Sequence, residues 1–295
     1  MNSGAVSTPA VRTEGIAKDY YGVPALQPLD LTVAAGERIA LIGHNGSGKS
    51  TLLRMLAGML EPTAGTASIA GHDLGSPDAR AALAFVSDEP VFYDDLTVWE
   101  HLEYIARLHH TDDWESHAEH LVDVLGIGQR VDDLPSTFSR GLKQKAQLAA
   151  SFVRPFEVLV VDEPFVGLDR AGRAALLELL AWAHDDGAAV VVATHELSSV
   201  DTADRLIALR DGTIVHDGDP AGADVAELTA GTPTGDDAGD GGGHDGDHVG
   251  DGGGDVGDGG GDAGDGASAG HVRDGERHDE RDHERDEERA QEHDE

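Results

Sequence analysis

A glycine-rich stretch in the first quarter of the chain could bind phosphate groups. The sequence GHNGSGKST fits the pattern G-x-x-x-x-G-K-[ST] and lies between a predicted strand and a predicted helix. Glycines let backbone N–H groups turn toward nucleotide phosphates, and the helix N-terminus adds partial positive charge. We expect Lys49 to reach the β- and γ-phosphates and Ser50 to ligate Mg²⁺; a chance glycine-rich turn would not need these flanking elements. The predicted binding residues are Gly43, His44, Asn45, Gly46, Ser47, Gly48, Lys49, Ser50 and Thr51.

Two adjacent acids follow an apolar run in the sequence VLVVDEP. A carboxylate at the end of a buried strand is costly unless it meets a cation, so we expect Asp162 to hold Mg²⁺ from the side opposite Ser50. Glu163 is predicted to be the general base that polarises the attacking water. The alternative is a solvated pair of acids at a strand end. Together with the glycine-rich stretch, the motif predicts a nucleotide hydrolase.

Apolar periodicity predicts the elements that position these residues. Strands and helices alternate, which is typical of an α/β fold with a mostly parallel sheet. Strands are expected at 38–43, 158–163 and 188–195, and helices at 48–60, 97–110, 113–125, 140–153 and 170–185. In the last helix, the residues predicted to share one buried face are Leu176, Leu177, Leu180 and Ala183.

The sequence FSRGLKQK, residues 138–145, connects the two motifs to a family. It resembles the signature of ATP-binding cassette (ABC) proteins, usually written L-S-G-G-Q. The resemblance implies that this helix start faces the γ-phosphate of ATP bound to a second cassette, in a homodimer or heterodimer. Ser139 is equally suited to an ordinary helix N-cap. Arg140 replaces a signature glycine, and either binds phosphate beside Gly141 or pairs with neighbouring acids.

Other family elements line up in order along the chain. The resemblance implies that Tyr20, with Tyr21 as the alternative, stacks on adenine, and that Asp169 lies at the interface between cassettes. His195 is expected to sense the γ-phosphate. Asp88 stands where the family pattern has Gln, so its predicted role as a catalytic residue and Mg²⁺ ligand is an open question: an ionised carboxylate can ligate the metal but cannot donate a hydrogen bond.

The resemblance implies a P-loop NTPase fold of the ABC type. It has a RecA-like core, an N-terminal antiparallel β subdomain and a helical signature subdomain at about residues 93–155, all within residues 1–230. Residues 231–295 are rich in Gly, Asp, His and Glu and have almost no apolar side chains, so we predict a disordered acidic tail. The tail histidines either bind metal weakly or are simply hydrated: His244, His248, His271, His278, His283 and His293.

Composition limits the partners and the location. The chain has 21 Lys and Arg against 57 Asp and Glu, a net charge of −36, which argues against nucleic acid as a partner. So acidic a chain resembles proteins from organisms with molar salt in the cytoplasm. There is no cysteine, and no apolar run is long enough for a signal peptide or a membrane span. A soluble protein at the cytoplasmic face of the membrane is therefore expected.

The combined prediction is a Mg²⁺-dependent ATPase subunit that powers a separate membrane permease, in an exporter. The interval between Lys49 and Asp162 suits the helical subdomain of a transporter and is far too short for the coiled-coil arm of DNA-repair ATPases. The alternative is a soluble regulatory ABC ATPase that acts on ribosomes or protein complexes. The transported substrate leaves no trace in these residues.

Overall fold

Two sheets with different strand patterns form the framework. The computed structural model describes residues 8–195 and 200–230, all within the unit Met1–Ala238. The smaller sheet is antiparallel, with order β2-β1-β4-β5. Buried and exposed residues alternate along much of β2, as expected of a strand with one face on the core. The strands of this sheet are β1 (Val11–Tyr20), β2 (Val23–Val33), β4 (Ala64–Ile69) and β5 (His72–Asp73).

The larger sheet is mostly parallel, as predicted, with order β10-β9-β3-β8-β7-β6. Every residue of β7 and β8 is buried, which is typical of parallel strands covered on both faces. The last two strands form an antiparallel hairpin at one edge and were not predicted from the sequence. The strands are β3 (Arg38–Ile42), β6 (Leu83–Val86), β7 (Val158–Asp162), β8 (Ala189–Ala193), β9 (Arg205–Arg210) and β10 (Thr213–Gly218).

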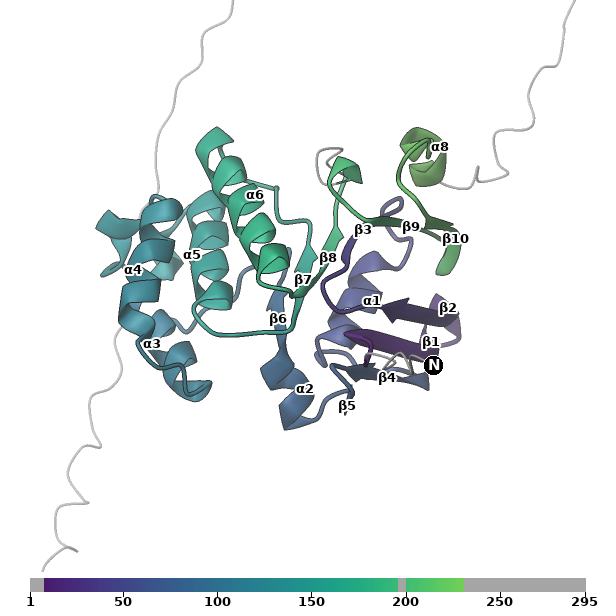
Figure 1. The fold of residues 1–295 in the computed structure, drawn as a ribbon, viewed down its shortest axis with the longest axis horizontal. Helices are drawn as coiled ribbons and strands as arrows, with labels where there is room; N and C mark the ends of the chain where they lie inside the picture. The colour runs from purple at the N-terminus through teal and green to yellow at the C-terminus, as the bar shows by residue number, and fades with distance from the viewer. Residues whose placement is uncertain (1–7, 196–199, 231–295) are drawn as a thin grey trace, which may run out of the picture. The chain divides into compact units, whose positions relative to one another are not determined.

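Helices cover both faces of the parallel sheet. In Figure 1, α3 to α6 lie on one side of β6–β8, and α1 lies between the parallel and antiparallel sheets. All predicted helices are present, but the first ends four residues early. The helices are α1 (Lys49–Leu56), α2 (Pro77–Ala82), α3 (Val98–Leu108), α4 (Trp114–Val124), α5 (Arg140–Phe152), α6 (Arg170–Asp185) and α8 (Val225–Thr229), with short 3-10 turns η1 (Gly128–Arg130) and η2 (Pro135–Thr137).

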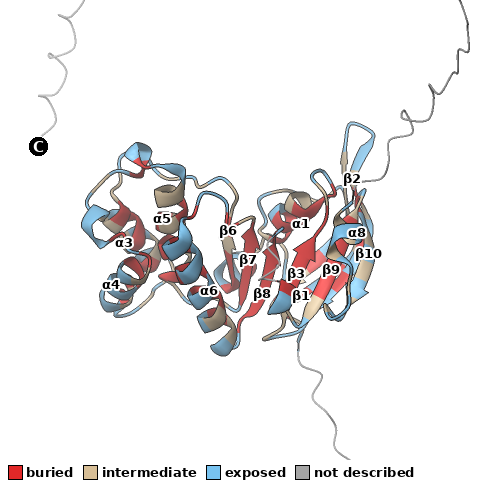
Figure 2. Cartoon of the chain, turned by 90° about the horizontal axis from the view of Figure 1, so that it is seen from above, coloured by how far each residue is buried: buried red, intermediate tan, exposed pale blue. Residues whose placement is uncertain are grey.

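Two main hydrophobic clusters hold these layers together, as the buried residues in Figure 2 show. One cluster packs α3–α6 against the parallel sheet through residues such as Phe152 and Val161. The other joins the antiparallel sheet, α1 and the opposite face of the parallel sheet, and includes Leu52 and Val160. Because consecutive strand residues face opposite sides, Val160 and Val161 belong to different clusters.

One prediction about the buried face of α6 was wrong. Leu176, Leu180 and Ala183 are buried as expected, but Leu177 is 37% exposed. Consecutive helical residues are rotated by about 100°, so the residue after Leu176 points away from the core. The buried positions that the prediction missed include Ala175 and Leu179, which lies three residues after Leu176.

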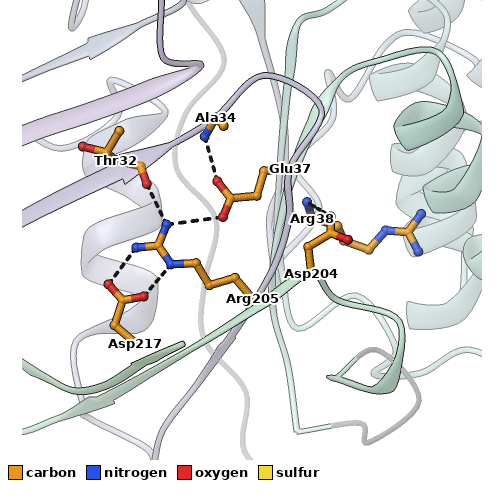
Figure 3. A network of polar contacts seen from close by, with 7 residues as sticks. All are labelled: Thr32, Ala34, Glu37, Arg38, Asp204, Arg205 and Asp217. Atoms are coloured by element: carbon orange, nitrogen blue, oxygen red, sulfur yellow. Dashed lines mark hydrogen bonds and ion pairs between the residues drawn. The ribbon is translucent and has the colours of Figure 1, made fainter. Parts of the chain in front are cut away.

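An arginine network ties the two sheets together where the β9–β10 hairpin meets β2 (Figure 3). The Arg205 guanidinium forms a two-point contact with Asp217 of β10, and its Nη2–Oδ2 distance is 2.7 Å. Its Nη1 donates to the Thr32 carbonyl of β2 at 2.9 Å and lies 3.3 Å from Glu37 Oε1. The hydrogen bonds and charge of Arg205 hold the pKa of Asp217 below its usual range.

Replacing Arg205 with Met should therefore destabilise the fold. We expect a loss of about 1–3 kcal/mol in the free energy of unfolding, because the substitution leaves four oxygen acceptors without their donor. Urea denaturation followed by circular dichroism measures this change. Arg12→Met is the matched control, since its pair with Glu14 is mostly exposed and should change stability by less than about 0.5 kcal/mol.

The same network predicts a dependence on pH. Because the folded-state pKa of Asp217 is lowered, its contribution is present above the unfolded pKa of about 3.9 and is lost as the pH falls through the folded value. The stability difference between wild type and Arg205→Met should therefore narrow in strong acid. A difference that stays constant down to the lowest pH at which both proteins fold would contradict this account.

Candidate nucleotide-binding site

The glycine-rich loop joins the end of β3 to the start of α1, as the sequence predicts. Gly48 is the residue before the helix and has φ of +105°, a left-handed conformation that favours glycine. A Cβ atom at Gly48 would lie 2.8 Å from the Ala25 carbonyl of β2. The loop therefore needs glycine here both for its turn and for its close approach to the antiparallel sheet.

Lys49 folds back over this loop. Its side chain is only 6% exposed, and Nζ donates to the Gly43 carbonyl at 2.8 Å and lies 3.4 Å from the His44 carbonyl. Burial lowers the pKa of the Lys49 ammonium, and the nearby Glu163 carboxylate opposes that shift. The charged group is thus fixed inside the loop, where phosphate oxygens would meet it.

Asp162 ends β7 as a fully buried carboxylate. Neither of its oxygens has a partner of ordinary hydrogen-bond geometry among the described residues. Burial raises the pKa of the Asp162 carboxyl, while the nearby Ser50 hydroxyl partly offsets that effect. A buried carboxylate facing a hydroxyl is a donor set that suits Mg²⁺, so these two residues fit the metal that the sequence predicts.

Glu163 leaves the strand in an unusual conformation. Its φ is +45°, in the left-handed region that costs energy for a residue with a side chain, and its N–H donates to the Ala193 carbonyl of β8 at 2.9 Å. Its Oε1 lies 4.0 Å from Lys49 Nζ and 2.9 Å from His195 Nε2. Burial raises the pKa of Glu163, which favours proton acceptance near neutral pH.

His195 follows β8 and contacts the Glu163 carboxylate directly. Burial and the charge of Lys49 lower the pKa of His195, which favours the neutral ring. An ionised carboxylate only accepts hydrogen bonds, so the neutral ring must carry its hydrogen on Nε2. The structure thus brings together three residues that the sequence separates widely.

Lys49, Ser50 and Glu163 line a cavity of about 370 Å³, whereas Asp162 and His195 are not part of its wall. Asp88, which follows β6, lies on its wall, and its Oδ1 is 3.1 Å from Arg54 Nη2 of α1. The wall consists of Ala25, Asn45, Gly46, Ser47, Gly48, Lys49, Ser50, Thr51, Asp88 and Glu163.

The signature residues do not line this cavity. Ser139 is exposed and caps α5, accepting from the Leu142 N–H at 3.4 Å, so the capping alternative holds in this structure. Arg140 is exposed on the same helix start. A Cβ atom on Gly141 would lie 2.4 Å from the Gly167 carbonyl, so glycine is needed for the close approach of the two segments.

Asp169 lies in the same region, outside the cavity. It caps α6 by accepting from the Gly172 N–H at 2.7 Å, and it lies 3.3 Å from Lys145 Nζ of α5. The Gly172 N–H and Lys145 hold the pKa of Asp169 below its usual range. Lys145 belongs to the polar end of the quoted signature stretch, but its partner could not be predicted from the sequence.

Tyr20 and Tyr21 are also absent from the cavity wall. Tyr20 is 44% exposed at the end of β1, and Lys18 Nζ lies 5.3 Å from the centre of its ring. Tyr21 is fully exposed at the turn into β2. Both residues lie within a few positions of Ala25, which lines the cavity.

Comparison with known proteins agrees with this geometry. Residues 26–166 match the family described as ABC transporter. The SkfA peptide export ATP-binding protein SkfE of Bacillus subtilis is 32% identical over 210 residues, which cover 70% of this chain and 88% of SkfE. The chain belongs to the ABC transporter ATP-binding family. The members of this family are ATPases, and this chain carries their ATP-binding domain, the ABC cassette.

Other relatives and solved structures support the same assignment. The cassette is 36% identical to the daunorubicin/doxorubicin resistance ATP-binding protein DrrA of Streptomyces peucetius, across 72% of this chain and 66% of DrrA. A solved ATP-binding subunit of an ABC transporter is 28% identical with a TM-score of 0.70, across 75% of this chain and 98% of that one. A dimeric cassette bound to ADP and Pi, 22% identical with a TM-score of 0.66, shares the fold, across 72% of this chain and all of that one.

Sequence reasoning missed Arg54 as a partner of the site. It lies in the last turn of α1, five residues after Lys49, and nothing in its surroundings in the sequence points to Asp88.

Across residues 8–195 and 200–230, no helix combines the length and apolarity needed to span a membrane. The predicted tail, 231–295, and its histidines lie outside the described residues.

Proposed function

We propose that this cassette hydrolyses ATP and powers a separate membrane permease in an export system. The observation that carries the proposal is the convergence of Lys49 and His195 on the Glu163 carboxylate, together with the buried carboxylate of Asp162, which precedes Glu163 in the chain.

In the proposed reaction, Lys49 and the backbone N–H groups of the loop bind the ATP phosphates. Ser50 and Asp162 would hold Mg²⁺, which would neutralise charge on the phosphates. Glu163 accepts the proton of a water whose oxygen bonds to the γ-phosphorus while the bond to the bridging oxygen breaks and ADP leaves. His195 holds the Glu163 carboxylate in place.

A second cassette would complete this site. The signature residues of this chain lie away from its own cavity, and residues Ser139 to Gly141 present a helix start that can bind phosphate. We therefore assign Ser139, Arg140, Gly141 and Asp169 to the nucleotide site and interface of the partner cassette. Tyr20 stays our first choice for adenine stacking, with Tyr21 as the alternative.

The export direction rests on relatives. SkfE is named for peptide export and DrrA for drug resistance, and both are named as ATP-binding proteins. We propose that a separate chain supplies the permease, since both relatives are named as ATP-binding proteins, and that the cassette binds it at the cytoplasmic face of the membrane.

A membrane pull-down tests the function. Tagged Glu163→Gln protein would be incubated with ATP and detergent-solubilised membranes of the source organism, and bound proteins would be identified by mass spectrometry. We expect a membrane protein with several spans in near-stoichiometric yield. Recovery of ribosomes or other soluble complexes, with no membrane protein, would instead favour a regulatory ATPase.

A further inference from the structure

The cavity wall carries a second carboxylate, Asp88, besides the proposed base Glu163. Asp88 lines the cavity together with Lys49 and Glu163, and the neighbouring residue of Glu163 in the chain, Asp162, is a further, fully buried carboxylate. An ionised carboxylate near a polyanionic ligand repels it, and the repulsion grows as water is excluded. A site for ATP therefore needs something that cancels the charge of Asp88.

Arg54 is placed to cancel it. Its Nη2 lies 3.1 Å from Asp88 Oδ1, and the two side chains are 45% and 31% exposed. Arg54 belongs to α1, the helix that begins with Lys49, so its position is fixed relative to the glycine-rich loop. The chain next to Asp88 is held as well, because the Oγ of Ser87, the residue before Asp88, lies 2.8 Å from the Gln147 amide of α5.

The pair has no evident structural purpose. An ion pair as exposed as this one contributes little to the free energy of unfolding. Its effect on the cavity is clearer, because the Asp88 carboxylate lies on the cavity wall and the Arg54 guanidinium carries the opposite charge 3.1 Å from it. The two charges thus act on the same site with opposite signs.

The geometry points to Arg54 as a positioning residue that holds Asp88 at the rim of the cavity and cancels its charge, so that the pair acts as a neutral unit toward ATP. This inference deepens the proposed function and depends on ATP binding at this cavity, but not on the identity of the permease. The pairing with Arg54 explains how an acidic residue such as Asp88 can lie in a site that binds a polyanion.

Direct binding of ATP to the full chain tests the inference. The dissociation constant of a fluorescent ATP analogue would be measured in ~0.1 M salt, once with EDTA and once with Mg²⁺. The proteins are wild type, Arg54→Gln, Arg54→Lys, Asp88→Gln and the Arg54→Gln/Asp88→Gln double variant. Arg12→Gln is the control for loss of a positive charge from an exposed pair away from the cavity wall.

In EDTA, Arg54→Gln should weaken binding roughly tenfold, because it leaves an uncompensated negative charge near the phosphates. The dissociation constants of Arg54→Lys and Arg12→Gln should stay within about threefold of the wild-type value. Asp88→Gln should bind the analogue as tightly as wild type or more tightly. The double variant should return to within about threefold of wild type, since it restores the net charge. The differences should shrink in ~1 M salt.

Two results would overturn the inference. A double variant as weak as Arg54→Gln would mean that Arg54 contacts phosphate itself. Weaker binding by Asp88→Gln with Mg²⁺, but not with EDTA, would mean that Asp88 is a metal ligand and not a compensated charge. If wild type binds no ATP, the proposed function fails instead. Nucleotide-free melting temperatures identify any variant that has not folded.

Discussion

Replacing Glu163 with Gln should lower ATP turnover by about 10²- to 10⁴-fold, the usual contribution of a general base. The amide has nearly the same shape, so the contact with His195 can persist through the amide oxygen. It cannot accept the proton of the attacking water, however. ATP should therefore bind normally and remain intact, and two cassettes that close around it should stay together.

Phosphate release measures turnover, and light scattering after size exclusion measures the ATP-dependent dimer. Glu157→Gln is the matched control, because Glu157 is exposed just before the opposite end of β7, and its turnover should stay near wild type. Full ATP turnover in Glu163→Gln would show that Glu163 is not the general base. Loss of turnover without any dimer would leave the base assignment intact but count against the proposed partner cassette.

Replacing Lys49 with Met should abolish ATP binding at micromolar concentrations. Lys49 Nζ is the buried cation of the glycine-rich loop, held by the Gly43 carbonyl. Charge-assisted hydrogen bonds contribute about 1.5–3 kcal/mol each, so losing those to the phosphates should raise the dissociation constant by about 100-fold or more. Met retains much of the apolar stem and limits any change in packing.

The rise in melting temperature caused by ATP separates this effect from unfolding. A saturating ligand stabilises the fold by about 2.7 kcal/mol at 100 times its dissociation constant, so wild type and Glu163→Gln should both show a clear rise. Lys49→Met should show none relative to its own nucleotide-free value. A normal rise in Lys49→Met would place the nucleotide elsewhere.

The sequence alone predicted the parts of the site that depend on local chain order. The loop at residues 43–48 lies between strand and helix because its glycines, the apolar run before it and the helical pattern after it are neighbours in the chain. The buried strand that ends at Asp162 was predicted for the same reason. The signature stretch at residues 138–145 identified the family, and the relatives confirm that assignment.

Other features could not be predicted because they depend on how distant segments meet. Periodicity placed Leu177 on the buried face of α6, but packing against the sheet selected Leu179 instead. The β9–β10 hairpin and its Arg205 network join residues from opposite ends of the domain. No local pattern encodes such a pairing.

The candidate site also combines features that the sequence predicted with features that only the tertiary structure determined. The sequence supplied Glu163, His195 and Asp88 as separate residues, each with a predicted role. Only the tertiary structure decided that Glu163 leaves its strand at a φ of +45° and meets the His195 ring, and that Asp88 meets Arg54. The physical reason is that short-range patterns fix strands, turns and helix starts, whereas side-chain contacts between them depend on the register of the sheet and the packing of α1 beneath it.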